Sequence, residues 1–278
     1  MLKFSRLARR ASALALALAC LSPVAASAAT ITANGGELHA TFSYGGSFPI
    51  ATHPLLSISR SGRLVYRRAV TSTICANQCW PSIFVGGSSL RVVSLNAAGP
   101  DVVVSLYSGG AHCCFVDEVY APAGSSYVKS EYDFGDPGAR ITVLRHGEFP
   151  VFLSADDSFA YAFTDYAASG LPLKVLAFRH GHFLNVTRQY PTLIAHDASQ
   201  WWSAFAAQKS SHYDDSVGVF AAWAADEYLL GHASHVKAVA LAQARAGHLN
   251  SALSPINPSG LGYVSQLERF LSHEGYGH

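Results

Sequence analysis

The chain carries little charge and lacks the motifs of the common hydrolases. Only 13% of its 278 residues are charged, while 50% are apolar. This composition excludes a disordered chain and allows a sizeable buried core. The patterns His-Glu-x-x-His and Gly-x-Ser-x-Gly are both absent, so the usual signals of a zinc protease and of a serine-hydrolase elbow are missing. We therefore expect a globular protein of one large domain or two small ones.

Long apolar segments are also absent, apart from a short one near the start. The chain begins with a basic segment, then an apolar segment, then the small residues Ala26, Ser27 and Ala28. This order is typical of a secretory signal, and a membrane span would need about 20 apolar residues. We predict a signal peptide over residues 1–28, cleavage near Ala28 and a secreted or periplasmic protein. A lipid anchor at Cys20 is the alternative.

Basic residues are too few in the mature chain to form a strongly positive face. Four of the 19 basic residues lie within the first ten positions, which leaves 15 against 18 acidic residues and a net charge of −3. A protein that binds nucleic acid needs a basic patch or stripe. We therefore expect no nucleic-acid partner, no membrane span and no cofactor. A protein or a glycan is the expected partner.

Cysteine is scarce, and four cysteines remain after the predicted signal. Cys75 and Cys79 lie four positions apart, whereas Cys113 and Cys114 are adjacent. In an oxidising compartment an even count predicts two disulfides. Because adjacent cysteines rarely bond to each other, we expect crossed bridges that join the Cys75–Cys79 loop to Cys113 and Cys114. A zinc site that includes His112 is the alternative, although structural zinc usually uses two separated cysteine pairs.

Residues 29–190 contain short apolar segments separated by turn residues. Arg60-Ser61-Gly62 separates two such segments and is typical of a hairpin turn. Glycine, proline or serine separates most of the others. Short strands with frequent turns favour antiparallel sheets. The clearest of these segments are ELHATFSY (37–44), RLVYRRAV (63–70), LRVVSL (90–95), DVVVSLYS (101–108) and ARITVL (139–144).

After Tyr190 the apolar period becomes helical. Four segments alternate apolar and polar residues at helical spacing, and Gly231 and Gly247 stand where two of them should end. Asp197 and Gln200 are spaced as a capping box at the start of the first segment. We predict an α+β fold with an antiparallel β-rich body over 29–190. A bundle of about four helices should follow over 191–278.

Two stretches of the β-rich body repeat one pattern of strand, polar turn and strand. VVSLNAAGPDVVVSLYSGGAHCC and ITVLRHGEFPVFLSADDSFAYAF place Asn96 and Arg145 at matching turn positions, 49 residues apart. A period near ~50 residues is typical of propeller repeats. The span from Leu90 to about Trp202 resembles secreted bacterial proteins with FG-GAP or VCBS repeats, the integrin-type propeller repeats. That resemblance implies a propeller-like architecture and export rather than a particular activity.

The resemblance also implies turns of the form Asp-x-Asp-Gly-Asp-Gly that bind calcium. Calcium requires about 6–8 oxygen ligands, several of them anionic. Neither turn of this chain supplies them, and Arg145 places a cation where the ion would lie. We therefore expect no metal in these turns. The residues at the ligand positions are Ser94, Asn96 and Ala98 in the first turn, and Val143, Arg145 and Gly147 in the second.

Asp156, Asp157 and His112 are the candidate binding residues. The adjacent aspartates could form a paired-carboxylate site, or they could accept hydrogen bonds from the backbone of the bend that contains them. The first hypothesis for function is a secreted, non-catalytic binding or structural module. The alternative is a secreted hydrolase with a carboxylate and histidine site around Asp156 and Asp157. Converging polar groups in a pocket would favour the hydrolase, and aspartates bonded to backbone amides would favour the module.

Overall fold

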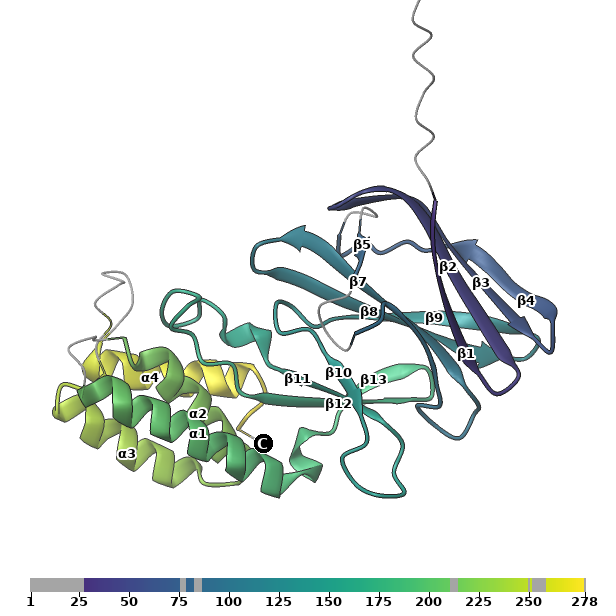
Figure 1. Cartoon of the computed structure of the whole chain (residues 1–278). Helices are drawn as coiled ribbons and strands as arrows, with labels where there is room; N and C mark the ends of the chain where they lie inside the picture. The colour runs from purple at the N-terminus through teal and green to yellow at the C-terminus, as the bar shows by residue number, and fades with distance from the viewer. Residues whose placement is uncertain are drawn as a thin grey trace, which may run out of the picture.

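The computed structural model describes residues 28–75, 79–82, 87–210, 215–249, 251 and 259–277. Three antiparallel sheets come first in this part of the chain, and four α-helices follow them (Figure 1). The predicted class, antiparallel strands followed by a helical region, is therefore confirmed. Apart from Ala28, the predicted signal peptide and Cys20 lie outside the described residues.

The first sheet is a four-stranded meander in which each strand pairs with the next. The predicted turn after Arg60 is confirmed, because two strands meet across Ser61 and Gly62. Both turn residues have positive φ, of 48° and 77°, as the tight hairpin turns that match strand twist require. The strands are β1 (Ala29–Gly35), β2 (Leu38–Ser47), β3 (Ile50–Arg60) and β4 (Arg63–Ala69).

The second sheet has β7 and β8 at its centre, and β9 pairs with β8. Two short strands, β5 and β6, pair with different parts of β7. The turn between β7 and β8 contains only Ala111 and His112. The strands are β5 (Trp80–Pro81), β6 (Leu90–Val93), β7 (Asp101–Gly110), β8 (Cys113–Ala123) and β9 (Ser126–Asp133).

The third sheet is also a four-stranded meander, interrupted by a long connection between its second and third strands. That connection, residues 156–172, contains the short 3₁₀ helix η1 (Asp157–Phe159). We call it the linking loop, because it extends from the sheet toward the helices. The strands are β10 (Arg140–Thr142), β11 (Val151–Ala155), β12 (Leu173–Arg179) and β13 (His182–Asn185).

The second sheet forms the middle layer of the β-rich body. Val102 and Val104 of β7 pack in a core shared with the first sheet, whereas Val103 packs in a core shared with the third sheet. Successive residues of a strand point to opposite faces, so a strand buried on both faces is largely apolar on both. This explains the three successive valines of β7, Val102–Val104.

The two stretches that resemble propeller repeats do form matching hairpins. One is β6 and β7, with Asn96 in the turn, and the other is β10 and β11, with Arg145 in the turn. A four-stranded antiparallel sheet is the unit that propellers repeat. However, the described strands form three open sheets and no closed ring. The relation to FG-GAP or VCBS proteins therefore remains a prediction.

The helices form a separate core with many alanines and aromatic rings. The predicted capping box is wrong, because the first helix begins at Pro191 and Asp197 lies inside it. Proline suits the first position of a helix, because the N–H group that it lacks would have no hydrogen-bond partner within the helix there. Gly231 and Gly247 do follow two helix ends, as predicted. After η2 (Thr187–Gln189) come α1 (Pro191–Ser210), α2 (Val217–Leu229), α3 (Ala233–Arg245) and α4 (Gly260–His273).

The linking loop connects the two regions. Its residues Phe159 and Phe163 belong to the helical core, where both rings contact Phe270 of α4. The helical core therefore includes residues well before the predicted boundary at position 190. Among the helices that the structure describes, none is both long enough and apolar enough to cross a membrane.

Candidate functional site

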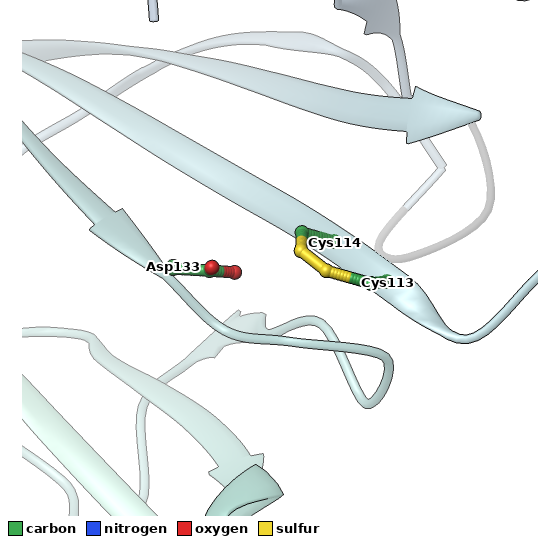
Figure 2. A group of neighbouring side chains, drawn as sticks. All are labelled: Cys113, Cys114 and Asp133. Atoms are coloured by element: carbon green, nitrogen blue, oxygen red, sulfur yellow. A yellow bond between two sulfur atoms is a disulfide. The ribbon is translucent and has the colours of Figure 1, made fainter. Parts of the chain in front are cut away.

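The four cysteines form two disulfides, but not the crossed pair that we expected. Cys75 bonds to Cys79, with Cα atoms 5.5 Å apart, and Cys113 bonds to Cys114, with Cα atoms 3.1 Å apart. The prediction followed from the rarity of bonds between adjacent cysteines, whereas here the peptide between Cys113 and Cys114 is cis and both sulfurs lie on one side of β8 (Figure 2). Each bridge is therefore local, and neither joins distant parts of the chain.

Hydrogen bonds to the backbone hold the hairpin that carries the adjacent pair. The Ser108 hydroxyl donates to the Cys113 carbonyl and accepts from the Cys114 amide at 2.6 Å. The Tyr107 hydroxyl donates to the Gly110 carbonyl. Gly109 has a φ of 84°, and a Cβ there would lie 2.5 Å from the Pro49 side chain. The turn therefore requires glycine at this position.

Three rings cluster beside this disulfide. The ring of His112, from the hairpin turn, packs against the ring of Tyr166 of the linking loop, with centroids 4.1 Å apart and planes tilted by 31°. Tyr161, which is 57% exposed, lies 5.5 Å from Tyr166 and 6.3 Å from His112. The backbone of Tyr161 has a φ of 61°, which is uncommon for a residue with a side chain. The linking loop thus presents aromatic surface to solvent next to the hairpin.

Three carboxylates border the rings. Asp136 accepts a hydrogen bond from the Tyr166 hydroxyl, and its amide donates to Asp157 at 3.3 Å. The Asp133 carboxylate accepts from the Gly135 amide at 2.9 Å. Burial raises the pKa of Asp157; the Asp136 amide opposes that shift, and the charges of neighbouring aspartates, including Asp133 and Asp136, add to it. Asp157 therefore retains its proton more readily than an ordinary aspartate.

Gly135 is required where these segments meet. A Cβ at this position would lie 2.1 Å from the Asp157 carboxyl group, and the residue has a φ of 62°. The chain after β9 can approach η1 this closely only because the side chain is absent. We call the whole surface the disulfide corner. It comprises His112, Cys113, Cys114, Asp133, Asp136, Asp157, Tyr161 and Tyr166.

Asp156 faces away from its neighbour and has a structural role. Its carboxylate accepts from Lys174 at 3.1 Å, from the Tyr276 hydroxyl at 2.9 Å and from the Ser158 amide at 3.2 Å. Burial alone would raise the pKa of Asp156, but the Lys174 charge and these hydrogen bonds lower it below its usual value. The predicted pair is thus divided, since Asp157 and His112 lie at the disulfide corner and Asp156 does not.

A cavity of about 270 Å³ lies between the corner and this buried ion pair. Its lining includes Asp133, Asp157, Lys174 and Glu274. Both aspartates nevertheless accept hydrogen bonds from backbone amides, Asp156 from Ser158 and Asp157 from Asp136, which is the arrangement that favours the binding module.

The two turns that the family resemblance associates with calcium lie at the opposite end of the sheets. Asn96 accepts a hydrogen bond from the Ala98 amide at 2.8 Å, which closes a local turn. The Arg145 guanidinium lies 4.6 Å from the centroid of the Tyr190 ring and pairs with Glu148 at 3.3 Å. Hydrogen bonds and packing therefore hold these hairpins.

A second polar centre lies inside the helical region. Asp226 of α2 has no exposed surface, and burial together with nearby Asp197 raises its pKa to about 10. Asp197 accepts hydrogen bonds from the Leu173 amide and from the Trp201 indole, each at 3.0 Å. Asp226 therefore remains protonated at neutral pH. This pair was not foreseen, because Asp197 resembles a helix cap in the sequence.

Comparison with known proteins finds partial relatives. The chain is 25% identical over 136 residues to a probable thylakoid lumen protein of Synechocystis sp., which covers 48% of this chain and 40% of that protein. It is 27% identical over 126 residues to an uncharacterised protein of Sinorhizobium fredii, which covers 44% of this chain and 19% of that protein. The chain thus spans less than half the length of either relative. No family model matches it, and no solved structure does.

Sequence reasoning missed four members of the disulfide corner, namely Asp133, Asp136, Tyr161 and Tyr166. A signal for the first two was present, because DFGD places two aspartates around Gly135, and glycine often permits a close backbone approach. The tyrosines carried no comparable signal. They reach the hairpin only because the linking loop returns across the end of the second sheet.

Proposed function

We propose that the protein is an extracytoplasmic, non-catalytic module that binds a glycan at the disulfide corner. The observation that carries this proposal is the exposed cluster of His112, Tyr161 and Tyr166, bordered by carboxylates. A sugar ring has an apolar face of C–H groups and a rim of hydroxyls. Aromatic rings with a polar edge suit such a ligand, because they bury apolar area while their hydroxyls still hydrogen-bond.

The carboxylates supply the complementary polar contacts. An ionised carboxylate only accepts hydrogen bonds, and sugar hydroxyls are donors that can satisfy it. Asp133 is exposed, whereas Asp136 and Asp157 are half-buried and held by backbone or hydroxyl donors. These fixed acceptors disfavour an anionic ligand such as nucleic acid, in keeping with the net charge of −3 after the predicted signal.

The contacts already present within the disulfide corner favour ligand binding without large rearrangement of its side chains. Tyr166 is packed against His112 and bonded to Asp136, so its ring loses little freedom when a ligand arrives. A preorganised site retains more of its interaction energy as affinity. The Tyr161 side chain is exposed, and we expect it to contribute directly to ligand contact.

Three observations support an extracytoplasmic location. The chain carries two disulfides, which persist mainly in oxidising compartments. Its first 28 residues have the pattern of a secretory signal. In addition, one partial relative is described as a probable thylakoid lumen protein. Each of these agrees with a protein that functions outside the cytoplasm.

A glycan array followed by titration calorimetry with the best-bound oligosaccharide tests the proposal. Tyr161→Ala should weaken binding at least about tenfold, since a hot-spot residue contributes roughly 2 kcal/mol or more. Phe149→Ala is the matched control, because Phe149 is also exposed but lies at the other end of β11. Absence of binding to any glycan, or equal losses for the two variants, would contradict the proposal.

A second candidate function is glycoside hydrolysis at the same corner. The specific observation is the raised pKa of Asp157, which lies beside Asp136. Glycosidases pair a protonated carboxyl group, as general acid, with an ionised carboxylate. If the corner is hydrolytic, Asp157→Asn should abolish sugar release while retaining binding. The non-catalytic proposal instead expects no release from any bound oligosaccharide by the wild type.

A further inference from the structure

The Cys113–Cys114 disulfide has a third potential metal ligand beside it. The two sulfur atoms and a carboxylate oxygen of Asp133 all lie within 4.8 Å of one another (Figure 2). Asp133 is exposed and Cys113 is half-buried, so solvent can reach this side of the bridge. Two sulfurs and one carboxylate oxygen form a donor set that suits zinc and related thiophilic cations.

The backbone holds these three residues together without help from the sulfur–sulfur bond. Phe115 donates from its amide to the Gly135 carbonyl at 2.7 Å, and Phe134 donates to the Phe115 carbonyl at 2.8 Å. These two bonds join Phe115, the residue after Cys114, to the two residues that follow Asp133. Ser108 separately binds the backbone of both cysteines. The ligand atoms should therefore remain neighbours after the disulfide is reduced.

A role in stability does not account for this bridge. A disulfide restricts the unfolded chain more when it closes a longer loop, and a bridge between adjacent residues closes the shortest loop there is. Cys113 and Cys114 also lie in a hairpin that hydrogen bonds already close. The pairing is therefore better explained by the chemistry of the two sulfurs.

We propose that Cys113, Cys114 and Asp133 form a redox-gated site for a thiophilic divalent cation such as Zn²⁺. In the closed form the two sulfurs are bonded to each other. A dithiol reductant opens the site. One of its thiolates attacks a cysteine sulfur, which breaks the sulfur–sulfur bond and forms a mixed disulfide with the reductant. The second thiol of the reductant then attacks this mixed disulfide and releases the cysteine. The reductant leaves as a disulfide, and both cysteines become thiols.

Cation binding then releases the two thiol protons, because the ligands are thiolates. Asp133 supplies an oxygen, and solvent can complete a four-coordinate shell. His112 is not needed as a ligand, since its ring packs against Tyr166. The proposal does not depend on glycan binding, because none of the three ligand atoms belongs to the ring cluster.

The experiment is a Zn²⁺ titration of the purified mature protein, oxidised and after anaerobic reduction with a phosphine, in competition with a chromophoric chelator. The oxidised protein should bind no zinc, and the reduced protein should bind one zinc per chain. Cys75→Ser/Cys79→Ser removes the other thiol pair and should leave this affinity unchanged. Cys113→Ser/Cys114→Ser should abolish binding, and Asp133→Asn should weaken it at least tenfold.

The Asp133→Asn variant separates loss of a zinc ligand from loss of the fold. Asn at position 133 can still accept the hydrogen bond from the Gly135 amide, so its circular dichroism and melting temperature should match those of the wild type. Equal zinc affinity in the oxidised and reduced wild type would overturn the gating. Full affinity in reduced Cys113→Ser/Cys114→Ser, or in Asp133→Asn, would overturn the ligand assignment.

Discussion

The sheets and the helices satisfy their buried carboxyl groups in different ways. Asp117 of β8 accepts a hydrogen bond from Ser105, and although burial raises its pKa, the value reaches only about 6. Asp226 of α2 instead lies beside another acid, Asp197, and its pKa rises to about 10. A neighbouring donor therefore lets a buried acid ionise near neutrality, whereas a neighbouring acid keeps it protonated. Above about pH 6 the helices should accordingly be the region whose stability falls as pH rises.

The two regions also differ in how their cores are built, and the linking loop joins them. The sheets stack in layers of alternating apolar residues, whereas the helices pack alanines against aromatic rings. Phe159 and Phe163 insert into the helical core from a loop of the third sheet. We therefore expect the regions to unfold together despite their separate cores.

Phe220→Ala should have the largest effect on stability, and it tests whether the two regions unfold together. Phe220 is fully buried and contacts Phe205, Trp223 and Tyr263. Truncating such a ring costs about 3–5 kcal/mol. Phe152→Ala is the matched change in the sheets. Calorimetry should find one transition, lowered in both variants. Two transitions, of which each variant lowers only one, would mean that the regions unfold independently.

Lys174→Met should have the next largest effect, because it removes the cation from buried Asp156 at the junction of the regions. Breaking a buried ion pair costs about 3 kcal/mol or more. The equivalent change at Lys237, in an exposed pair with Glu268, should have little effect. Denaturant unfolding at neutral pH measures both. A loss at Lys174 no greater than the loss at Lys237 would contradict this prediction.

The pH dependence of the Asp156 pair has a defined sign. Its folded-state pKa is lowered, so the pair stabilises the protein above the unfolded pKa of about 3.9. This contribution disappears as the pH falls through the lower folded-state value. The difference between wild type and Lys174→Met should therefore narrow in strong acid.

Asp226→Asn should stabilise the helical region. Below about pH 3.9 the aspartate is protonated in both states. Above that pH the unfolded state releases the proton and the folded state keeps it, so stability falls with rising pH until the folded pKa of about 10. Each pH unit removes up to about 1.4 kcal/mol, or roughly 2.7 kcal/mol between pH 6 and pH 8. Asparagine cannot ionise, and its amide can donate to Asp197.

Urea unfolding of wild type and Asp226→Asn at pH 6 and pH 8 measures this slope. The variant should lose less stability than the wild type over this interval. Asp117→Asn is the control from the sheets, since the folded pKa of Asp117 lies near pH 6 and its contribution should not change above that pH. Parallel slopes for wild type and Asp226→Asn would show that Asp226 is ionised in the folded protein.

The smallest effects should come from the disulfides, which in the described part of the chain lie only in the sheet region. The chain-entropy relation gives about 2 kcal/mol for the five-residue loop closed by Cys75 and Cys79, and about 1 kcal/mol for the adjacent pair. Double serine variants of each pair, compared by thermal unfolding, measure both. A larger cost for the Cys113 and Cys114 pair would assign that bridge a structural role.

Much of the fold could be predicted from local patterns. The hairpin at Ser61 and Gly62 and the helix ends at Gly231 and Gly247 follow from residues that suit positive φ. The start of α1 could not be placed in this way. Asp197 has the sequence spacing of a cap, yet it lies inside α1, where it accepts hydrogen bonds from the Leu173 amide of β12 and from Trp201 of the same helix.

Only part of the candidate site could be predicted. His112 and Asp157 were identified from their own neighbours in the sequence, and both lie at the disulfide corner. Tyr161 and Tyr166 were not, because their relation to His112 depends on the path of a loop about 50 residues further along the chain. The bridge between adjacent cysteines was missed because adjacent cysteines rarely bond to each other, and residue type alone does not mark the exceptions.

The bond between Tyr276 and Asp156 joins residues 120 positions apart. Neighbouring strands of the meanders can pair soon after they are synthesised, since contacts close in sequence form fastest. The contact between the sheets and the helices at Asp156 can form only after the segment around Tyr276 has been synthesised. Until then the helical core that surrounds Phe159 and Phe163 is incomplete. We expect chains interrupted before this segment to expose the linking loop to proteases. Closure of this contact would thus distinguish chains that contain the segment around Tyr276 from chains interrupted before it.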